Sequence, residues 1–283
     1  MLDGREKKSY TVAKKGKAMA MLIQCKDENP KNLAAYMDGE YGRALYLYID
    51  LLRYGCQTPG IRVYRTETEG KQTGLFLVYH GCLHCYSRNL NCAEADLAAL
   101  FEAEKPHTVF FCEELFDALG YRFAAPYEEH RVKMFRAVPY HEGEPVVLEE
   151  AKDEELDEVT RFLRQNEEYA SLYTHEELCA QLRERLHDGY GRCFIARENG
   201  RIIFHAATMA EEFPIAMGGM VLLDPSKQGQ GQGRRYFSAM YNRMMEKGFT
   251  IYSNNLDERA EHLHRSMGYV EETKLVKLTK NNI

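Results

Sequence analysis

The chain has 283 residues, of which 45% are hydrophobic and 28% are charged, a composition typical of globular rather than disordered or fibrous proteins. The net charge of -6 argues against general nucleic-acid binding, which usually requires a strongly basic surface. The sequence has no run of 18 apolar residues, so we expect no membrane span. A chain of this length suits two domains of roughly 140 residues each.

The N-terminal residues 1–22 are basic and lack an apolar stretch of signal-peptide length, so we interpret them as a frayed arm. The eight cysteines are scattered without a regular disulfide framework. This pattern is typical of reduced thiols, and we expect a cytoplasmic protein.

The first clear elements lie at residues 61–80, "IRVYRTETEGKQTGLFLVYH", which predict a strand, a turn at Gly70 and a second strand. A further hairpin is expected to turn near Gly81. The cysteines that follow raise the question of a metal site, and they are Cys82, Cys85 and Cys92, near His80 and His84. Residues three apart on a strand point to opposite faces, and no second cysteine pair has a comparable spacing. We therefore expect no metal, with zinc as the alternative.

A polar stretch at residues 139–145, "PYHEGEP", predicts a linker because it combines two prolines with a glycine. We place the boundary between two domains here, with the first covering residues 1–142 and the second covering 143–283.

The second half alternates helices and strands. Helical periodicity appears at 153–165 and at 174–189, where Thr174 and Glu177 form a capping box. Strands are expected at 193–197 and 201–210, joined by the strong turn signal Asn199-Gly200, and again at 215–223. A helix with one apolar face follows and ends at Gly248. A strand at 249–253 and a helix at 258–268 are expected to close the domain.

The first half repeats part of this pattern. Its strand, turn and strand around Gly70 resemble the hairpin around Gly200, and "ELFDALGY" resembles "EHLHRSMGY". The distance from the turn glycine to the later Gly-Tyr is 50 residues in the first half and 68 in the second. We interpret this as two related α/β domains, each with a mixed sheet flanked by helices. The alternative is chance similarity.

The stretch "SKQGQGQGRR" at residues 226–235 is what the first half lacks. It follows a strand and precedes a helix, so bare amides and the positive end of a helix dipole meet at one point and favour a phosphate. A P-loop is excluded because no Gly-Lys-Ser/Thr follows. A Rossmann site fits badly, because the spacing is GxGxG and the loop lies deep in the domain.

These residues resemble the Gln/Arg-x-x-Gly-x-Gly/Ala signature of the GNAT superfamily of acyl-CoA-dependent N-acyltransferases, with Gln228, Gly231 and Gly233 in the fixed positions. "MVLLDP" before the loop and "NNLDERAEHLHRSMGY" after it are also similar to that family. The paired arrangement resembles tandem GNAT proteins whose N-terminal half lost its coenzyme site.

The resemblance implies acetyl-CoA as the co-substrate, and no metal. Its pyrophosphate would lie on the amides of the loop with Arg234 nearby, its pantetheine arm would pair with the strand edge, and Asn255 would also contact it. The implied coenzyme-binding residues are Val221, Leu222, Leu223, Gln228, Gly229, Gln230, Gly231, Gln232, Gly233, Arg234 and Asn255. Gly218 and Gly219 suit either a bulged edge or close packing against a helix.

Acyl transfer needs a base for the amine, an oxyanion donor and an acid for the thiolate. A strand N-H near Val221 can be the oxyanion donor, and Glu211 or Glu212 is the candidate base. The family's usual tyrosine acid corresponds to His264 here, with Tyr252 and Tyr269 as substitutes. A histidine of ordinary pKa can protonate a thiolate.

Two functions follow from these residues. The first is an N-acetyltransferase in which a small-molecule primary amine or amino-acid-like acceptor attacks acetyl-CoA directly. Its pocket would lie between the halves, where the tyrosine-rich residues 36–54 could line it or else form core. The alternative is a non-catalytic acyl-CoA-binding protein. In either case we expect a monomer or homodimer with neither nucleic acid nor membrane as a partner.

Overall fold

The computed structural model describes residues 21–255 and 258–280, and the expected N-terminal arm falls almost entirely outside them. Contacts divide the chain into two compact units, which are residues 1–133 together with 272–283, and residues 134–271. The sequence predicts a single cut between 142 and 143. In the structure the boundary lies between residues 133 and 134, and the end of the chain, residues 272–283, returns to the first unit.

In the 12-stranded sheet of the chain, the strands of the first unit follow the order β1-β2-β3-β4-β5-β12, and β4 and β5 are parallel. Gly70 and Gly81 have positive φ angles of 73° and 76°, so both expected turns are confirmed. The strands are β1 (Met21–Cys25), β2 (Ile61–Thr68), β3 (Lys71–Tyr79), β4 (Cys82–Tyr86), β5 (Thr108–Cys112) and β12 (Val270–Lys280). The helices are α1 (Pro30–Ala34), α2 (Leu45–Tyr54), α3 (Glu94–Glu104) and α4 (Glu113–Ala118).

The strands of the second unit follow the order β6-β11-β10-β9-β8-β7, and β10 and β11 are parallel. Asn199 and Gly200 have φ angles of 51° and 78°, which confirms the predicted hairpin. The strands are β6 (Tyr127–Arg136), β7 (Glu149–Glu150), β8 (Cys193–Glu198), β9 (Arg201–Glu212), β10 (Ile215–Leu223) and β11 (Thr250–Asn255). The helices are α5 (Leu156–Leu163), α6 (Glu167–Leu172), α7 (His175–His187), α8 (Gln232–Glu246) and α9 (Glu258–Ser266).

The two units share one topology. In each, an edge strand is followed by helices, by three antiparallel strands, by a helix and by a strand parallel to its neighbour. Thus β2-β3-β4-α3-β5 corresponds to β8-β9-β10-α8-β11. The structure therefore shows the mixed α/β fold and the internal repeat expected from the sequence.

The last strand of the chain is the element that the sequence analysis missed. We expected the helix at 258–268 to close the second half, but β12 follows it and pairs antiparallel with β5 from Leu275 to Thr279. Conversely, β6 begins in the first unit and ends in the second, where the next residue, Ala137, donates its N-H to the Ile251 carbonyl at 2.9 Å. Each unit thereby obtains a strand for a sheet edge that would otherwise expose unpaired backbone groups.

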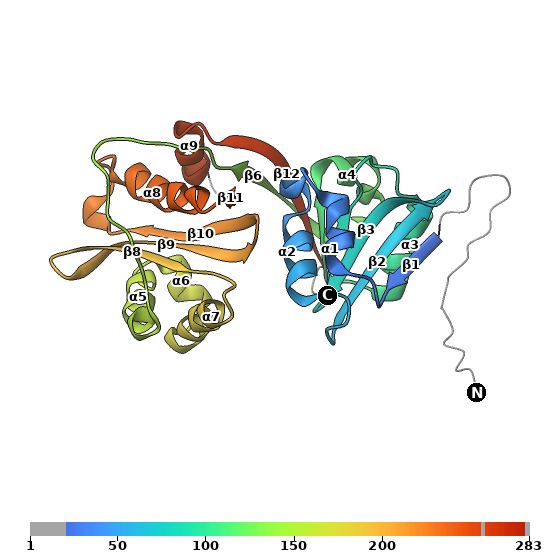
Figure 1. Ribbon diagram of the computed structural model, residues 1–283, viewed down its shortest axis with the longest axis horizontal. Coiled ribbons are helices and arrows are strands. Elements are labelled where there is room, and N and C mark those ends of the chain that lie inside the picture. The colour runs from blue at the N-terminus through green and yellow to red at the C-terminus, as the bar shows by residue number, and fades with distance from the viewer. Residues whose placement is uncertain (1–20, 256–257, 281–283) are drawn as a thin grey trace. The chain divides into compact units, whose positions relative to one another are not determined.

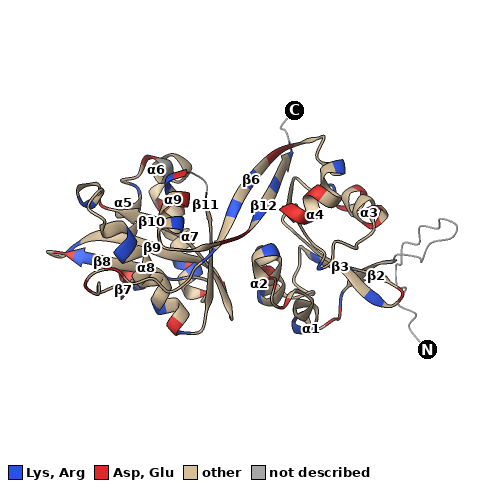
Figure 2. Cartoon of the chain, turned by 90° about the horizontal axis from the view of Figure 1, so that it is seen from above, with Lys and Arg blue, Asp and Glu red and all other residues tan. Residues whose placement is uncertain are grey.

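Charged side chains hold the returning strand within the first unit. Glu113 of α4 forms ion pairs with Lys274 of β12 at 2.9 Å and with Arg131 of β6 at 2.7 Å. Figure 2 shows the acidic α4 and the basic positions along β6 and β12. These pairs supplement the backbone ladder of β12.

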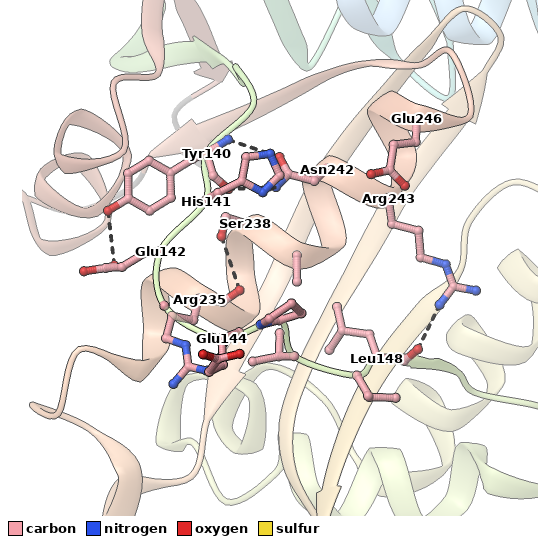
Figure 3. Close-up of a pocket in the computed structure, with 15 residues that line it drawn as sticks. Tyr140, His141, Glu142, Glu144, Leu148, Arg235, Ser238, Asn242, Arg243 and Glu246 are labelled. Carbon is pink, nitrogen blue, oxygen red and sulfur yellow. Dashed lines mark hydrogen bonds between the residues drawn. The ribbon is translucent and has the colours of Figure 1, made fainter.

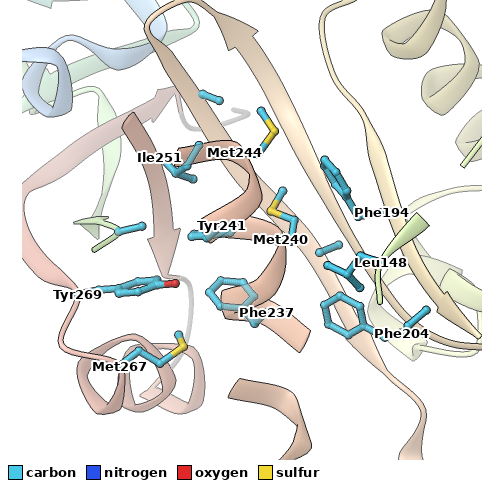
Figure 4. Packing of buried hydrophobic residues seen from close by; sticks show 14 of the residues in the cluster. Leu148, Phe194, Phe204, Phe237, Met240, Tyr241, Met244, Ile251, Met267 and Tyr269 are labelled. Carbon is cyan, nitrogen blue, oxygen red and sulfur yellow. The ribbon is translucent and has the colours of Figure 1, made fainter. Parts of the chain in front are cut away.

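The second unit packs its sheet between two helical layers (Figure 1), with α8 and α9 on one face and α5, α6 and α7 on the other. The α8 layer is closed, because the side chains of Phe237, Met240, Tyr241 and Met244 are at most 2% exposed. Figure 4 shows this cluster, which also confirms the predicted apolar face of α8. On the opposite face, the predicted capping box of α7 is present.

The tyrosine-rich segment at 36–54 packs within the first unit. Tyr36 meets the ring of Tyr86 with 5.5 Å between ring centroids, and Tyr54 meets Tyr79 at 5.0 Å. Tyr48 is 6% exposed. These contacts are those of a core segment. In the part of the chain that the structure describes, no helix has both the length and the apolar character to cross a membrane.

Candidate active site

The strands β10 and β11 separate at the centre of the second unit. Their parallel pairing runs from Ile215 opposite Thr250 to Met217 opposite Tyr252, whereas β10 continues to Leu223. The later part of β10, including Val221 and Leu223, therefore has no ladder partner in β11 within the described residues. A strand edge of this kind can pair with an extended ligand.

The same part of β10 is bulged on its other side. Its register with β9 shifts between Gly219 and Leu222, and Met220 has a positive φ of 51°, which is uncommon for a residue other than glycine. The Met220 carbonyl accepts a hydrogen bond from His205 Nδ1 at 2.8 Å. A bulge redirects backbone groups out of the ladder, and the predicted oxyanion donor, an N-H near Val221, lies within this shift of register.

His205 is fully buried and neutral. Burial lowers its pKa to about 4, and because a carbonyl can only accept, its proton resides on Nδ1. The Nε2 atom has no hydrogen-bond partner among the described residues. The imidazole thus supports the bulge from the interior of the sheet.

The two glycines of β10 have different neighbours. A Cβ on Gly218 would lie 2.1 Å from Tyr241 Oη, whereas a Cβ on Gly219 would lie 2.9 Å from Cγ of the flexible Met209 side chain. A register shift with β9 falls between Met217 and Gly218. Both interpretations left open by the sequence therefore apply to Gly218, which lies at a bulge and against a helix.

The glycine loop lies where β10 ends and α8 begins. Gly229 and Gly231 both have φ angles of +74°, and no described atom lies within 4 Å of a Cβ built on either. Gly231 is the N-cap of α8, with no side-chain cap and no acidic residue in the first turn. The first N-H groups of a helix lack internal partners, so this helix start presents bare donors to open space.

The glutamines of the loop fix its shape. Gln228 donates from Nε2 to the Leu223 carbonyl at 3.0 Å and accepts from Arg259 of α9 at 3.1 Å. Gln230 Nε2 donates to the Ser226 carbonyl at 2.9 Å, and Gln232 Nε2 donates to Gln230 Oε1 at 3.2 Å. The side chains of all three glutamines thus bond to other groups of the protein.

The two arginines after the loop contact the segment that precedes β7. Arg234 pairs with Glu142 at 2.7 Å, and Arg235 donates to the Glu144 carbonyl at 2.6 Å. The predicted linker is thus bonded along α8 and lines an open pocket of about 510 Å³. Figure 3 shows it, with Asn242 joined to Tyr140 and Arg243 joined to the Leu148 carbonyl.

The corresponding helix of the first unit begins differently. The N-cap of α3 is Ala93, and its first turn contains Glu94 and Asp96. Acidic side chains in the first turn of a helix repel a phosphate. The first turn of α8 contains none. The contrast supports a coenzyme site in the second unit alone.

Of the two candidate bases, Glu211 is buried with both oxygens engaged. Thr208 donates its hydroxyl to Oε1, and Arg192 pairs with Oε2 at 2.9 Å. Arg192 in turn lies 6.0 Å from the ring centroid of Phe249, which packs on the α8 cluster. Glu212 is the half-exposed neighbour at the end of β9.

His264 is buried in α9 beside β11. Its Nδ1 bonds to the Ala260 carbonyl at 2.8 Å and its Nε2 to the Ser253 hydroxyl at 2.9 Å. Burial lowers the His264 pKa to about 4. Because the carbonyl fixes the proton on Nδ1, Nε2 accepts from Ser253 in the neutral form.

The other residues considered for the site lie as follows. Tyr252 and Tyr269 are 2% and 4% exposed, and burial raises the pKa of Tyr269. Asn255 ends β11, and its side chain lies outside the described residues. Within those residues no cluster of three metal-ligating side chains occurs, and all eight cysteines are free thiols.

Two residues near the bulge were missed from the sequence. His205 interrupts the apolar run "RIIFHAATMA", and a polar residue inside such a run is the signal that could have found it. Arg185 of α7 lies with Nη1 3.5 Å from Met220 Sδ. An arginine in a charged helix carries no signal that separates it from a solvated face.

Residues 148–269 match the family model described as the acetyltransferase (GNAT) family. No curated protein matches the chain.

Solved structures share the fold over most of the chain. An acetyltransferase from the GNAT family of Colwellia psychrerythraea is 13% identical, with a TM-score of 0.61 over 92% of this chain and 99% of its own. A tandem GNAT protein from the clavulanic acid biosynthesis pathway is 13% identical, with a TM-score of 0.55 over 92% and 98%. A GCN5-related N-acetyltransferase from Kribbella flavida is 16% identical, with a TM-score of 0.53 over 74% and 87%.

Proposed function

Residues 148–269 of this chain belong to the acetyltransferase (GNAT) family, and from this premise we propose that the protein transfers an acetyl group from acetyl-CoA to a primary amine of a small molecule. The family supports acyl transfer from acyl-CoA in general. The observation that carries the proposal for this chain is the bare, uncapped start of α8 directly after the open edge of β10.

The coenzyme occupies both features in this proposal. Its pyrophosphate accepts hydrogen bonds from the amides of residues 229–233, where glycine leaves the approach open. Its pantetheine arm pairs with the backbone of Val221 to Leu223, and Arg234 adds charge beside the phosphates. The side chain of Gln228 acts indirectly, because it holds the loop against β10 and α9.

The transfer step takes place at the bulge. The nitrogen lone pair of the neutral amine attacks the thioester carbonyl carbon, a C-N bond forms, and the negative charge on oxygen is stabilised by the N-H near Val221. The C-S bond then breaks and CoA leaves as the thiolate. The proton lost by the amine passes to a base, and the thiolate gains one to become the free thiol.

The two proton transfers have different candidates. Glu211 and Glu212 are the candidate bases. Thr208 and Arg192 hold both oxygens of Glu211, and Glu212 lies half-exposed at the end of β9. His264 as the acid would require a proton on Nε2, the atom that accepts from Ser253 in the neutral ring. The alternative needs no acid from the protein. CoA leaves as the thiolate and takes its proton from water afterwards, which a thiol pKa near 8.5 allows.

A non-catalytic acyl-CoA-binding protein is the second candidate. The placement of His264 favours it, since a buried neutral histidine replaces the family's usual acid. The two functions share the coenzyme site and differ only in turnover.

Thiol release from acetyl-CoA across a panel of primary amines, with the product identified by mass spectrometry, tests the proposal. We expect a thiol and an N-acetylated amine in equal amounts. Coenzyme binding without turnover on any amine would support the second candidate.

A further inference from the structure

A cation without a carboxylate partner lies beside the bulge of β10. Among the described residues, no acidic oxygen lies within ion-pair distance of Arg185, and its guanidinium instead contacts two methionine sulfurs, Met220 Sδ at 3.5 Å and Met209 Sδ at 3.7 Å. Arg185 is half-buried. Its neighbour on α7, Arg183, is paired with Asp153 at 2.8 Å.

Arg185 lies on the face of the sheet that α5 and α7 cover. Tyr169, Tyr173, Leu186 and Met220 are partly buried residues that pack on the cluster beneath α5 and α7. The opposite face of the sheet is filled by the closed α8 layer. The contact with Met220 Sδ places the Arg185 guanidinium against the bulge residue, on the face that this cluster occupies.

A guanidinium in such surroundings favours an anion. It forms two parallel hydrogen bonds to a carboxylate, and such bonds are stronger where neighbouring side chains exclude water. Because Met220, whose sulfur contacts Arg185, is itself the bulge residue, Arg185 can hold the carboxylate of a molecule whose amine reaches the bulge.

We propose that Arg185 binds a carboxylate of the acceptor, so that the substrate is a small amine that also carries a carboxylate. This inference rests on the proposed acyl transfer, in which the amine nitrogen bonds to the acyl carbon and CoA leaves as the thiol. Arg185 touches the part of the acceptor that does not react and selects for it.

The test compares amino acids with their own amides in the thiol-release assay, on wild type and on Arg185→Gln. We expect wild type to prefer the acid over the amide. The variant should lose about tenfold to a hundredfold in kcat/KM for the acid, as for removal of a charged hydrogen-bond pair, with little change for the amide. Arg183→Gln on the same helix is the matched control and should leave both values unchanged.

Coenzyme affinity, measured by calorimetry on the same variants, separates this inference from the proposed function. Unchanged CoA binding together with equal turnover of acids and amides by wild type would overturn the role of Arg185 and leave acyl transfer intact. If no amine turns over, binding of amino acids to the CoA complex is measured instead. Absence of a difference between wild type and Arg185→Gln there would also overturn the inference.

Discussion

His205 Nδ1 donates a hydrogen bond to the carbonyl oxygen of Met220 across 2.8 Å and so joins the interior of β9 to the bulge of β10. His205→Leu removes the donor and leaves a buried carbonyl unsatisfied, at a cost of about 1 to 3 kcal/mol in unfolding free energy. We expect kcat to fall about tenfold while the Kd for CoA changes little, because the amides of the loop lie elsewhere. Steady-state kinetics and calorimetry measure the two quantities.

The matched variant is His205→Asn, whose side-chain amide can donate from nearly the same position as Nδ1. It should recover a large part of the lost kcat. Equal loss in the two variants would show that the hydrogen bond does not position the bulge.

Stability should decrease as the pH falls from about 6.5 to about 4. Three buried histidines, His84, His205 and His264, have pKa values lowered to about 4 by burial. The unfolded chain binds protons on them below about pH 6.5 while the folded chain stays neutral, so each one removes about 1.4 kcal/mol per pH unit in this window. Denaturant unfolding at pH 7, 6 and 5 should show this slope of the unfolding free energy against pH. His264→Asn should reduce the slope by the contribution of one proton, about 1.4 kcal/mol per pH unit.

Glu142→Gln should tighten coenzyme binding. In the free protein Arg234 is paired with Glu142, and both side chains are 35% exposed. Release of the guanidinium makes it available to the phosphates. A half-exposed pair is weak, so we expect a gain of up to about fivefold in affinity at low salt. Raising the salt concentration to about 0.5 M should abolish most of the gain in affinity through screening. A gain that does not depend on salt would contradict this explanation.

Gly218→Ala and Gly219→Ala should differ in their effect on stability. A Cβ on Gly218 meets the buried Tyr241 ring, whereas a Cβ on Gly219 meets the flexible Met209 side chain. Overpacking a rigid site costs about 1 to 3 kcal/mol, and we expect that loss at Gly218 and less than half of it at Gly219. Chemical denaturation measures both, and equal losses would mean that the Tyr241 ring moves aside readily.

The elements whose signals are local were predictable from the sequence. The Asn199-Gly200 turn, the Thr174 capping box and the apolar face of α8 all depend on residues within a few positions of one another. The glycine loop belongs to the same class, because its positive φ angles and its position between a strand and a helix follow from sequence order.

The features that depend on distant partners were not predictable. The pairing of β12 with β5 joins residues more than 160 positions apart, and nothing in "VEETKLVKLTK" specifies which edge it will meet. The electrostatic state of His264 depends on Ser253 and the Ala260 carbonyl around it. The contact of Arg185 with two methionine sulfurs is likewise a property of packing.

The calorimetric titration of CoA into wild type, Gly231→Asp and Gly189→Asp tests the central assignment most directly. Gly231 and Gly189 both have positive φ angles, of 74° and 63°, with no described atom within 4 Å of a built Cβ, so the two substitutions impose similar backbone strain of about 1 kcal/mol. Only Gly231 lies in the loop, where a carboxylate would repel the pyrophosphate. We predict that wild type and Gly189→Asp bind CoA with similar affinity and that Gly231→Asp does not bind it measurably. Equal affinity in all three proteins would contradict the coenzyme site.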